Sequence, residues 1–292
     1  MYKLKYIPDL GTAITLGSET QIAADLLDIN GVSININSSS GSGRIGESVI
    51  SSFISGKTFS ISGVIYGKDL SSGKDMIRKS FRPFGSGKLY FNENYYIKVY
   101  VKSTPTFSPS RGDGRFSIQL YAPFPFFKKS VSNYYTLNIV NASFSYPVNF
   151  STPHKFGETN LSSIIKIKND GDSECNYKLT VYPNDQDYAA EFSNFKLENI
   201  TTGQYLEING DLKHGERLVI SRDDDGYLSA VAESSSGTRD VINWISDSSN
   251  FFYINAGQST IRFTAERTGG NSLFPPEVEL EFREVRGSVY ES

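Results

Sequence analysis

The chain has 292 residues, which favours two domains over one, and a formal net charge of −3 from 29 basic and 32 acidic side chains. A balance this close gives no overall field that would attract nucleic acid or an acidic membrane, so nucleic-acid binding is disfavoured. Hydrophobic residues make up 38% of the chain and charged residues 21%, which is typical of a folded protein and not of a disordered one. No window is long and apolar enough to predict a transmembrane helix, and the start of the chain lacks the apolar stretch of a secretory signal.

The first half is predicted to be mostly β-structure, because aromatic and β-branched residues suit a pleated, half-buried surface. Strands are expected at residues 2–7, 29–36 and 59–66, and the Ser/Gly-rich run 38–43 is expected to be a flexible loop. Residues 69–81 are the one convincing helix, with Asp69 or Ser71 as a cap and Pro83 soon after the end.

A hairpin is predicted at residues 87–101, where strands 89–91 and 95–101 flank the turn residues 92–94. An alternating strand at 116–122 follows and ends at Pro123. The segment 128–153, which contains Pro147 and Pro153, is interpreted as the seam between two domains, 1–132 and 133–292.

The second half is predicted to be a β-sandwich, because short strands recur at the spacing that is typical of that fold. Turn residues separate most of them, as at 169–171, 201–203 and 223–226. The expected strands are 164–168, 177–182, 195–199, 205–208, 217–220, 227–231, 241–245, 261–264 and 278–282.

Catalytic chemistry is hard to place in this sequence. The only histidines, His154 and His214, lie outside any nucleophile motif, and phosphate-loop and dinucleotide fingerprints are absent. Cys175 is the only cysteine, so an intramolecular disulfide and a structural zinc site are both excluded, which fits synthesis in a reducing cytoplasm. We therefore predict no enzyme activity, no catalytic residues, no cofactor and no metal.

Two features have a structural and a functional interpretation. The residues Asp223, Asp224 and Asp225 before Gly226 suggest calcium, but an Asp-Gly pair between two strands is a strong hairpin signal and the turn is favoured. Trp244 is favoured as a core residue among apolar neighbours, with a sugar-stacking platform as the alternative.

The order of these features resembles the distal tail protein (Dit) family of siphophages. In the first half the resemblance lies in a strand, a helix that ends near a proline, a hairpin start and an aromatic-Pro stop. In the second half it lies in turns of the Asn-x-Gly and Thr-Thr-Gly kinds, a Gly-Glu strand start and an apolar segment that ends at a glycine. The segments are 59–65, 77–85, 87–89 and 116–127, then 169–172, 197–203, 212–220 and 249–257.

The resemblance implies a mainly β fold with an N-terminal β-sandwich, which carries one helix and a projecting hairpin, and a C-terminal galectin-like β-sandwich. It implies a structural protein of the virion, a homo-hexameric ring at the phage tail tip. The ring would join the tail tube protein to the tail-associated hub or lysin and to baseplate or receptor-binding proteins. The stop at residues 122–125 departs from the family, and the Ser/Gly-rich segment 38–46 has no assigned role.

The hairpin 87–101 is the predicted inter-subunit clasp, with ordinary sheet packing as the alternative. Its strands carry more aromatic surface than one sheet face needs, and aromatic residues are enriched in interface cores. The candidate interface residues are Tyr90, Phe91, Tyr95, Tyr96 and Tyr100. The alternative function is a carbohydrate-binding module for a host cell-wall glycan, with Trp244 as its candidate sugar-binding residue.

Overall fold

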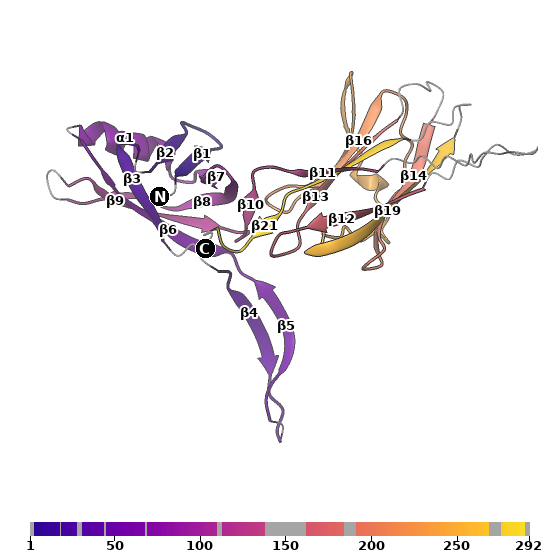
Figure 1. Ribbon diagram of the computed structural model, residues 1–292, viewed down its shortest axis with the longest axis horizontal. Coiled ribbons are helices and arrows are strands. Elements are labelled where there is room, and N and C mark those ends of the chain that lie inside the picture. Colours follow the sequence, from indigo (N-terminus) through magenta and orange to yellow (C-terminus); the bar gives the residue numbers. More distant parts are fainter. Residues whose placement is uncertain are drawn as a thin grey trace, which may run out of the picture. The chain divides into compact units, whose positions relative to one another are not determined.

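A computed structural model describes residues 3–17, 19–27, 31–43, 45–67, 69–109, 113–137, 162–183, 191–268 and 276–289. The chain divides into two compact units, Met1–Val131 together with Val285–Ser292, and Ser132–Glu284. Strands dominate both units, and the described residues contain one α-helix, so the predicted mainly β class is confirmed (Figure 1). No pattern in the sequence predicts that the chain returns to the first unit after Glu284.

The first unit is built on one nine-stranded sheet with the main order β2-β1-β7-β8-β9-β6-β3; β10 also pairs with β8, and β21 pairs with β10. The two end strands of the sheet approach each other where the Gly17 amide, just after β2, donates a 2.9 Å hydrogen bond to the Ile22 carbonyl of β3. The strands are β1 (Leu4–Pro8), β2 (Ile14–Leu16), β3 (Ile22–Leu27), β6 (Lys57–Ile65), β7 (Ser86–Phe91), β8 (Tyr95–Phe107), β9 (Arg115–Ala122), β10 (Phe127–Lys129) and β21 (Val285–Arg286).

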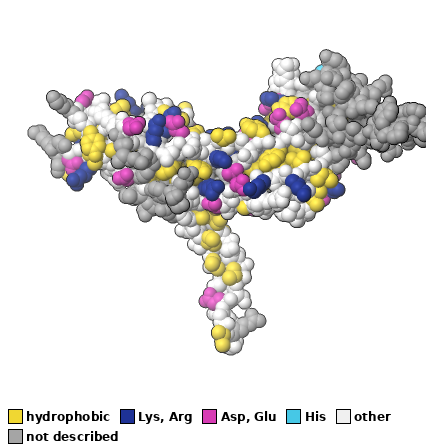
Figure 2. Space-filling view, viewed as in Figure 1, with side chains coloured by type: hydrophobic (Ala, Val, Ile, Leu, Met, Phe, Trp, Pro, Cys, Tyr) yellow, Lys and Arg dark blue, Asp and Glu magenta, His cyan; other side chains and the backbone are white. Residues whose placement is uncertain are grey.

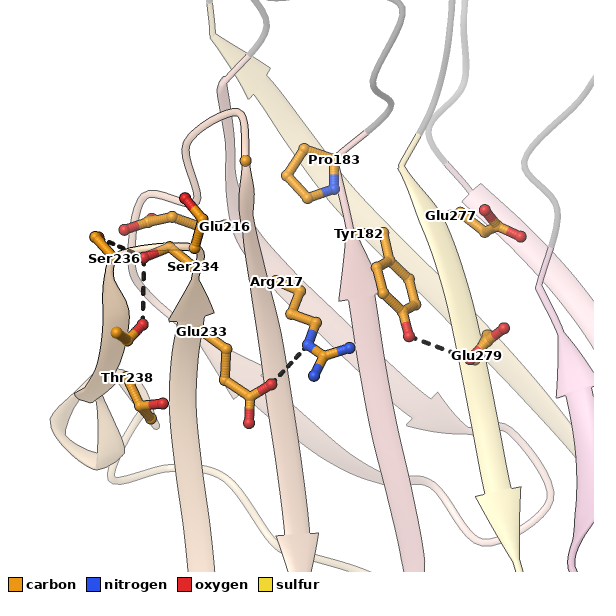
Figure 3. Close-up of a pocket in the computed structure, with 13 residues that line it drawn as sticks. Tyr182, Pro183, Glu216, Arg217, Glu233, Ser234, Ser236, Thr238, Glu277 and Glu279 are labelled. Atoms are coloured by element: carbon orange, nitrogen blue, oxygen red, sulfur yellow. Dashed lines mark hydrogen bonds and ion pairs between the residues drawn. The ribbon is translucent and has the colours of Figure 1, made fainter.

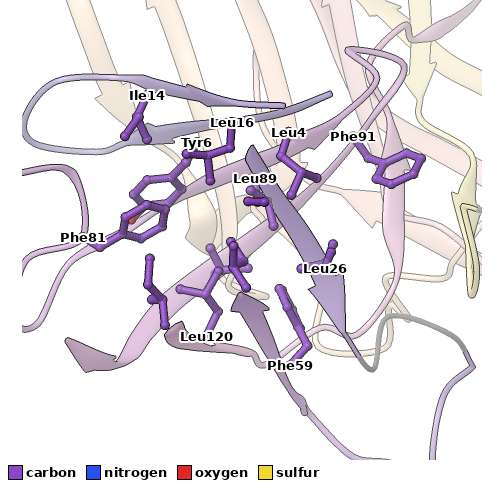
Figure 4. Close-up of a cluster of buried hydrophobic side chains, with 14 of the residues drawn as sticks. Leu4, Tyr6, Ile14, Leu16, Leu26, Phe59, Phe81, Leu89, Phe91 and Leu120 are labelled. Carbon is purple, nitrogen blue, oxygen red and sulfur yellow. The ribbon is translucent and has the colours of Figure 1, made fainter. Parts of the chain in front are cut away.

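The helix α1 (Leu70–Ser80) confirms the prediction for residues 69–81. The Asp69 side chain caps it by accepting a hydrogen bond from the Ser72 amide at 3.1 Å, which satisfies one of the free amides of the first turn. Ile77 is buried in the core, and Phe81, just after the helix, stacks on Tyr6 of β1 with ring centroids 4.3 Å apart (Figure 4). The helix is therefore held to the sheet by apolar packing.

A separate two-stranded hairpin extends from the first unit between β3 and β6 (Figure 1). It consists of β4 (Ile34–Ser39) and β5 (Ser48–Ile54), and we call residues 34–54 the arm. The predicted strand over 29–36 is only partly right, because β4 begins at Ile34 and continues to Ser39, into the loop expected over 38–43. The strand β5 was missed because serines dilute its apolar residues.

The second unit contains a six-stranded sheet, ordered β11-β20-β13-β16-β17-β18, and a four-stranded sheet, ordered β12-β19-β14-β15. Strands of both sheets alternate buried and exposed side chains, as expected when one face of each sheet covers a core. The strands are β11 (Asn133–Thr136), β12 (Ser162–Asn169), β13 (Tyr177–Tyr182), β14 (Glu191–Asn199), β15 (Gln204–Ile208), β16 (Glu216–Arg222), β17 (Leu228–Ser234), β18 (Gly237–Asp240), β19 (Gly257–Thr268) and β20 (Glu277–Phe282).

One predicted strand is wrong. Residues 241–245 contain a short 3-10 helix, Ile242–Trp244, in place of a strand. The Asp240 carboxylate accepts a 2.9 Å hydrogen bond from the Ile242 amide, and the Trp244 amide donates to the Val241 carbonyl at 2.9 Å, so local bonds close a turn here. Much of the predicted seam at 128–153 lies outside the described residues.

Candidate assembly interface

The arm is a β-hairpin with apolar side chains on a serine-rich background. Ile34 pairs with Ile54, and Ile36 lies two residues further along β4, so these three isoleucines share one face. Phe53, which pairs with Asn35, lies on the opposite face. The register shifts between Asn37 and Ser38, a β-bulge of the kind that increases local twist.

Every strand residue of the arm is exposed to solvent. Its large apolar side chains expose between 42% and 108% of their surface, although such residues are usually buried. In the view of Figure 2, apolar patches lie near the base of the arm and at its tip, with polar surface between them. The exposed apolar residues are Ile34, Ile36, Ile45, Val49, Ile50, Phe53 and Ile54.

The base of the arm is tied to the first unit by polar contacts. The Lys57 ammonium donates a 2.8 Å hydrogen bond to the Gly31 carbonyl, and the Ser55 amide donates to the Ser33 carbonyl at 3.2 Å. Along the arm, the Asn37 side chain donates to Ser51 across the strands at 3.0 Å. The outer edges of β4 and β5 have no strand partner in the described part of the chain. The arm therefore offers apolar faces and two free strand edges.

A hairpin at 87–101 is confirmed, since β7 and β8 pair from Ser86 opposite Tyr100 to Phe91 opposite Tyr95. At the turn between them, Asn92 and Glu93 adopt positive φ angles of 49° and 61°. The hairpin does not project, however. β7 also pairs with β1, and β8 also pairs with β9, so both outer edges are already occupied. The projecting hairpin of this fold is the arm.

The five predicted interface residues divide into two groups. Phe91 and Tyr96 are 4% and 2% exposed, and Phe91 belongs to the core of the first unit itself. Tyr90, Tyr95 and Tyr100 are half-buried. The Tyr90 and Tyr96 rings lie 5.5 Å apart, and the Lys88 ammonium lies 4.9 Å from the Tyr96 ring centroid, so part of the aromatic surface is used within the unit.

Trp244 is half-buried in the second unit, and its ring is already in contact with other groups. The Arg239 guanidinium lies 5.1 Å from the ring centroid, and Gly210 lies so close that an added Cβ would fall 2.0 Å from a ring carbon. Arg239 also forms a 3.2 Å ion pair with Glu216. These contacts leave little of the ring for stacking on a sugar.

The Asp-rich segment is a turn in the structure. The Asp223 side chain accepts hydrogen bonds from the Asp225 and Tyr227 amides, both at 2.9 Å, and the β16–β17 hairpin continues on either side. Among the described residues, no group of three or more His, Cys, Asp or Glu side chains is arranged to hold a metal ion. Cys175 is buried, and His154 lies outside the described residues.

Residues 170–284, which lie wholly within the second unit, match the family model described as "Siphovirus-type tail component, C-terminal domain". The whole chain is similar in fold to the crystal structure of the Dit protein of phage SPP1. The TM-score is 0.59 at 10% sequence identity, and the match covers 98% of this chain and 99% of that one. The predicted resemblance to the distal tail protein family is therefore confirmed by the family model over residues 170–284 and, over the whole chain, by the fold.

Two structures of the phage P2 baseplate in its activated conformation, with Ca and with Sr, are also similar to this chain. Their TM-scores are 0.49 and 0.48 at 13% identity, with 99% of this chain covered in each case and 99% and 100% of theirs. At these scores they add nothing to the argument. No curated protein sequence matches the chain. The described residues include no helix that is long and apolar enough to cross a membrane.

Proposed function

We propose that this chain is a non-enzymatic structural protein of a phage tail tip, a distal tail protein whose copies close into a ring of six. In this role it joins the tail tube protein to the tail-associated hub or lysin and to baseplate or receptor-binding proteins. The observation that carries the proposal is the full-length fold match to SPP1 Dit, whose structure is titled a paradigm of the hub adsorption apparatus in phages that infect Gram-positive bacteria. The family match of residues 170–284 supports it independently.

The proposal assigns ring formation to the first unit and outward presentation to the second. Synthesis takes place in the host cytoplasm, which suits a chain with a single buried cysteine, and the finished protein resides in the virion. A head-to-tail contact between identical copies closes into a ring when its rotation closes, so one surface that protrudes and one that receives it are sufficient.

The arm is the best candidate for the protruding surface. A two-stranded hairpin is only marginally stable in water by itself, and an exposed apolar strand edge invites pairing with another chain. An arm with this much exposed apolar surface is stabilised when a neighbour covers it. The half-buried Tyr90, Tyr95 and Tyr100 remain proposed as a second, smaller contact.

The chemistry of the arm predicts how its contact responds to salt. Between Ile34 and Ile54 only Arg44 and Glu47 carry a formal charge. Contacts between apolar side chains are not screened by ions, whereas contacts between exposed charges are. Assembly through the arm should therefore persist at high ionic strength.

Light scattering coupled to size exclusion tests the proposal on the full chain at high micromolar concentration. We expect a mass of six chains at both 0.1 and 1 M salt, and its loss in Ile36→Asn. The matched control is Ile164→Asn on β12 of the second unit, because Ile164 is exposed to 59% and Ile36 to 60%. A monomeric wild type, or equal loss of assembly in both variants, would contradict the proposal.

A further inference from the structure

The second unit has a polar groove on the outer face of its six-stranded sheet, at the end where β16, β17 and β18 meet β13 and β20 (Figure 3). Its volume is about 1020 Å³. The sheet pairing explains its floor. Tyr182 is opposite Glu277, and Glu233 is opposite both Arg217 and Thr238. Since directly opposed residues share a face, these side chains form one row across the sheet.

The inner face of the same strands is apolar. Val181, Leu218 and Val278, each next in sequence to a residue of the row, are buried at 0% exposure. Successive side chains of a strand point to opposite faces of the sheet. Because these three residues face the core, the residues of the row must lie on the outer face. The turn between β17 and β18, which contains Ser235 and Ser236, forms one wall of the groove.

Several polar groups in the groove are held in place before any ligand arrives. The Arg217 guanidinium forms a 2.6 Å ion pair with Glu233, which raises the pKa of Arg217. The Tyr182 hydroxyl lies 3.5 Å from the Glu279 carboxylate, and burial, followed by the Glu279 charge, raises the pKa of Tyr182. Ser234 and Ser236 are hydrogen-bonded at 2.8 Å. Side chains that are already ordered lose less conformational entropy when they bind a ligand.

The lining narrows the class of ligand. It contains four carboxylates and one guanidinium, so it repels anions such as phosphates and uronic acids. Its walls are mostly polar, so a lipid chain would find little apolar contact. It does offer hydroxyl and guanidinium donors beside carboxylate acceptors, and one aromatic ring, Tyr182. Sugar hydroxyls donate and accept at once, and a sugar ring packs on an aromatic side chain.

We propose that this groove binds a saccharide without negative charge, with Glu233 and Glu279 accepting from its hydroxyls, Arg217 donating to them and Tyr182 contacting a sugar ring. Trp244 does not line this groove, and its ring is covered by Arg239 and Gly210. It gives a tail-tip protein a means of touching a glycan directly, beyond its role in the ring.

The test uses the full chain on an array of oligosaccharides, neutral (glucose, galactose, mannose, rhamnose and N-acetylglucosamine tetramers) and anionic (uronic acid tetramers), with calorimetry on the best neutral binder. We expect binding of at least one neutral tetramer, at least tenfold tighter than any anionic one. Affinity should fall at least tenfold in Tyr182→Ala and in Glu233→Gln. The control is Tyr227→Ala, since Tyr227 is a 75% exposed tyrosine of the same unit outside the groove lining.

Several results would overturn the inference: no neutral sugar bound, preference for anionic sugars, full affinity in both groove variants, or an equal loss in the control. Binding of a tetralysine peptide in the absence of sugar binding would show a protein-docking surface instead. Circular dichroism checks that each variant is folded. If Tyr182→Ala does not fold, the test rests on Glu233→Gln, which keeps the shape of the side chain. Ring formation is measured separately, so failure here leaves the proposed assembly role intact.

Discussion

The first unit contains two hairpins of similar length whose surroundings are opposite. The β7–β8 hairpin carries the aromatic residues and lies inside the sheet, paired on both sides. The arm is rich in serine and has no strand partner beyond its own two strands in the described residues. The aromatic side chains of the β7–β8 hairpin are therefore partly used within its own sheet, whereas the apolar side chains of the arm stay exposed in the described part of the chain.

Truncation of a buried isoleucine should separate the two hairpins most clearly. Ile97 of β8 is 1% exposed and belongs to the core, so Ile97→Ala should lower the free energy of unfolding by about 3 kcal/mol, through lost burial and a cavity. Ile36→Ala in the arm should change it by less than about 0.5 kcal/mol, because an exposed side chain has little burial to lose. Urea unfolding at low protein concentration measures both. Comparable losses would mean that the arm packs on its own unit.

A pair of glycines gives the next largest difference. At Gly87 of β7 an added Cβ would lie 2.4 Å from the Ile7 carbonyl oxygen, so Gly87→Ala should cost about 2 kcal/mol by forcing β1 and β7 apart. Gly46, at the tip of the arm, has nothing within 4 Å of its added Cβ. Its positive φ of 92° puts strain into the arm alone, so Gly46→Ala should leave the melting of the unit unchanged. A melting temperature unaffected by Gly87→Ala would refute the close approach of the two strands.

Alkaline pH should show how well the strands around the β7–β8 hairpin are shielded from water. Tyr6 lies opposite Leu89 of β7, its hydroxyl is buried without a hydrogen-bond partner among the described residues, and burial raises its pKa to about 12. When folding raises the pKa of a tyrosine, the free energy of unfolding is unaffected below the pKa of the unfolded state, which is about 10. It then falls as the pH rises from there towards the pKa of the folded state.

Tyr6→Phe should therefore be nearly neutral at pH 7 and more stable than the wild type by about 1 kcal/mol at pH 11, as the unfolded tyrosine alone ionises. The arm contains no tyrosine, so deleting it should leave the alkaline loss unchanged. Chemical unfolding at the two pH values provides the measurement. A wild type and a variant that lose stability in parallel would place Tyr6 in contact with water.

The smallest effect on stability is expected for a substitution on the outer face of the β7–β8 hairpin. Lys88→Met removes the ammonium that lies 4.9 Å from the Tyr96 ring centroid but keeps an apolar stem, so it should cost about 0.5 kcal/mol. If Tyr90 and Tyr100 form a second contact between copies, this variant should also weaken ring formation slightly, which light scattering would detect. A higher free energy of unfolding in this variant would show that Lys88 destabilises the folded protein.

Elements whose hydrogen bonds join residues close in the sequence could be predicted from local sequence patterns. The sequence predicts the helix from a cap at Asp69 or Ser71 and the proline soon after its end, and the structure places the cap at Asp69 and the last helical residue at Ser80. The turns at 92–94 and 223–226 were identified from residue types that tolerate the required backbone. The strand predicted at 241–245 is wrong because the Asp240 side chain favours a turn through a local hydrogen bond. The apolar residues of the segment do not indicate that bond.

Taken alone, the sequence determined a mainly β chain in two parts, the positions of most turns and the absence of recognisable catalytic motifs. The tertiary structure alone decided which surfaces remain open. Strand partners come from residues far apart in the chain, such as Leu4 beside Phe91 and Gly63 beside Phe116, and no local pattern encodes them. Those partners cover Phe91, while Ile36 stays 60% exposed although it pairs with Ser52, and they align Tyr182, Arg217 and Glu233 along one groove.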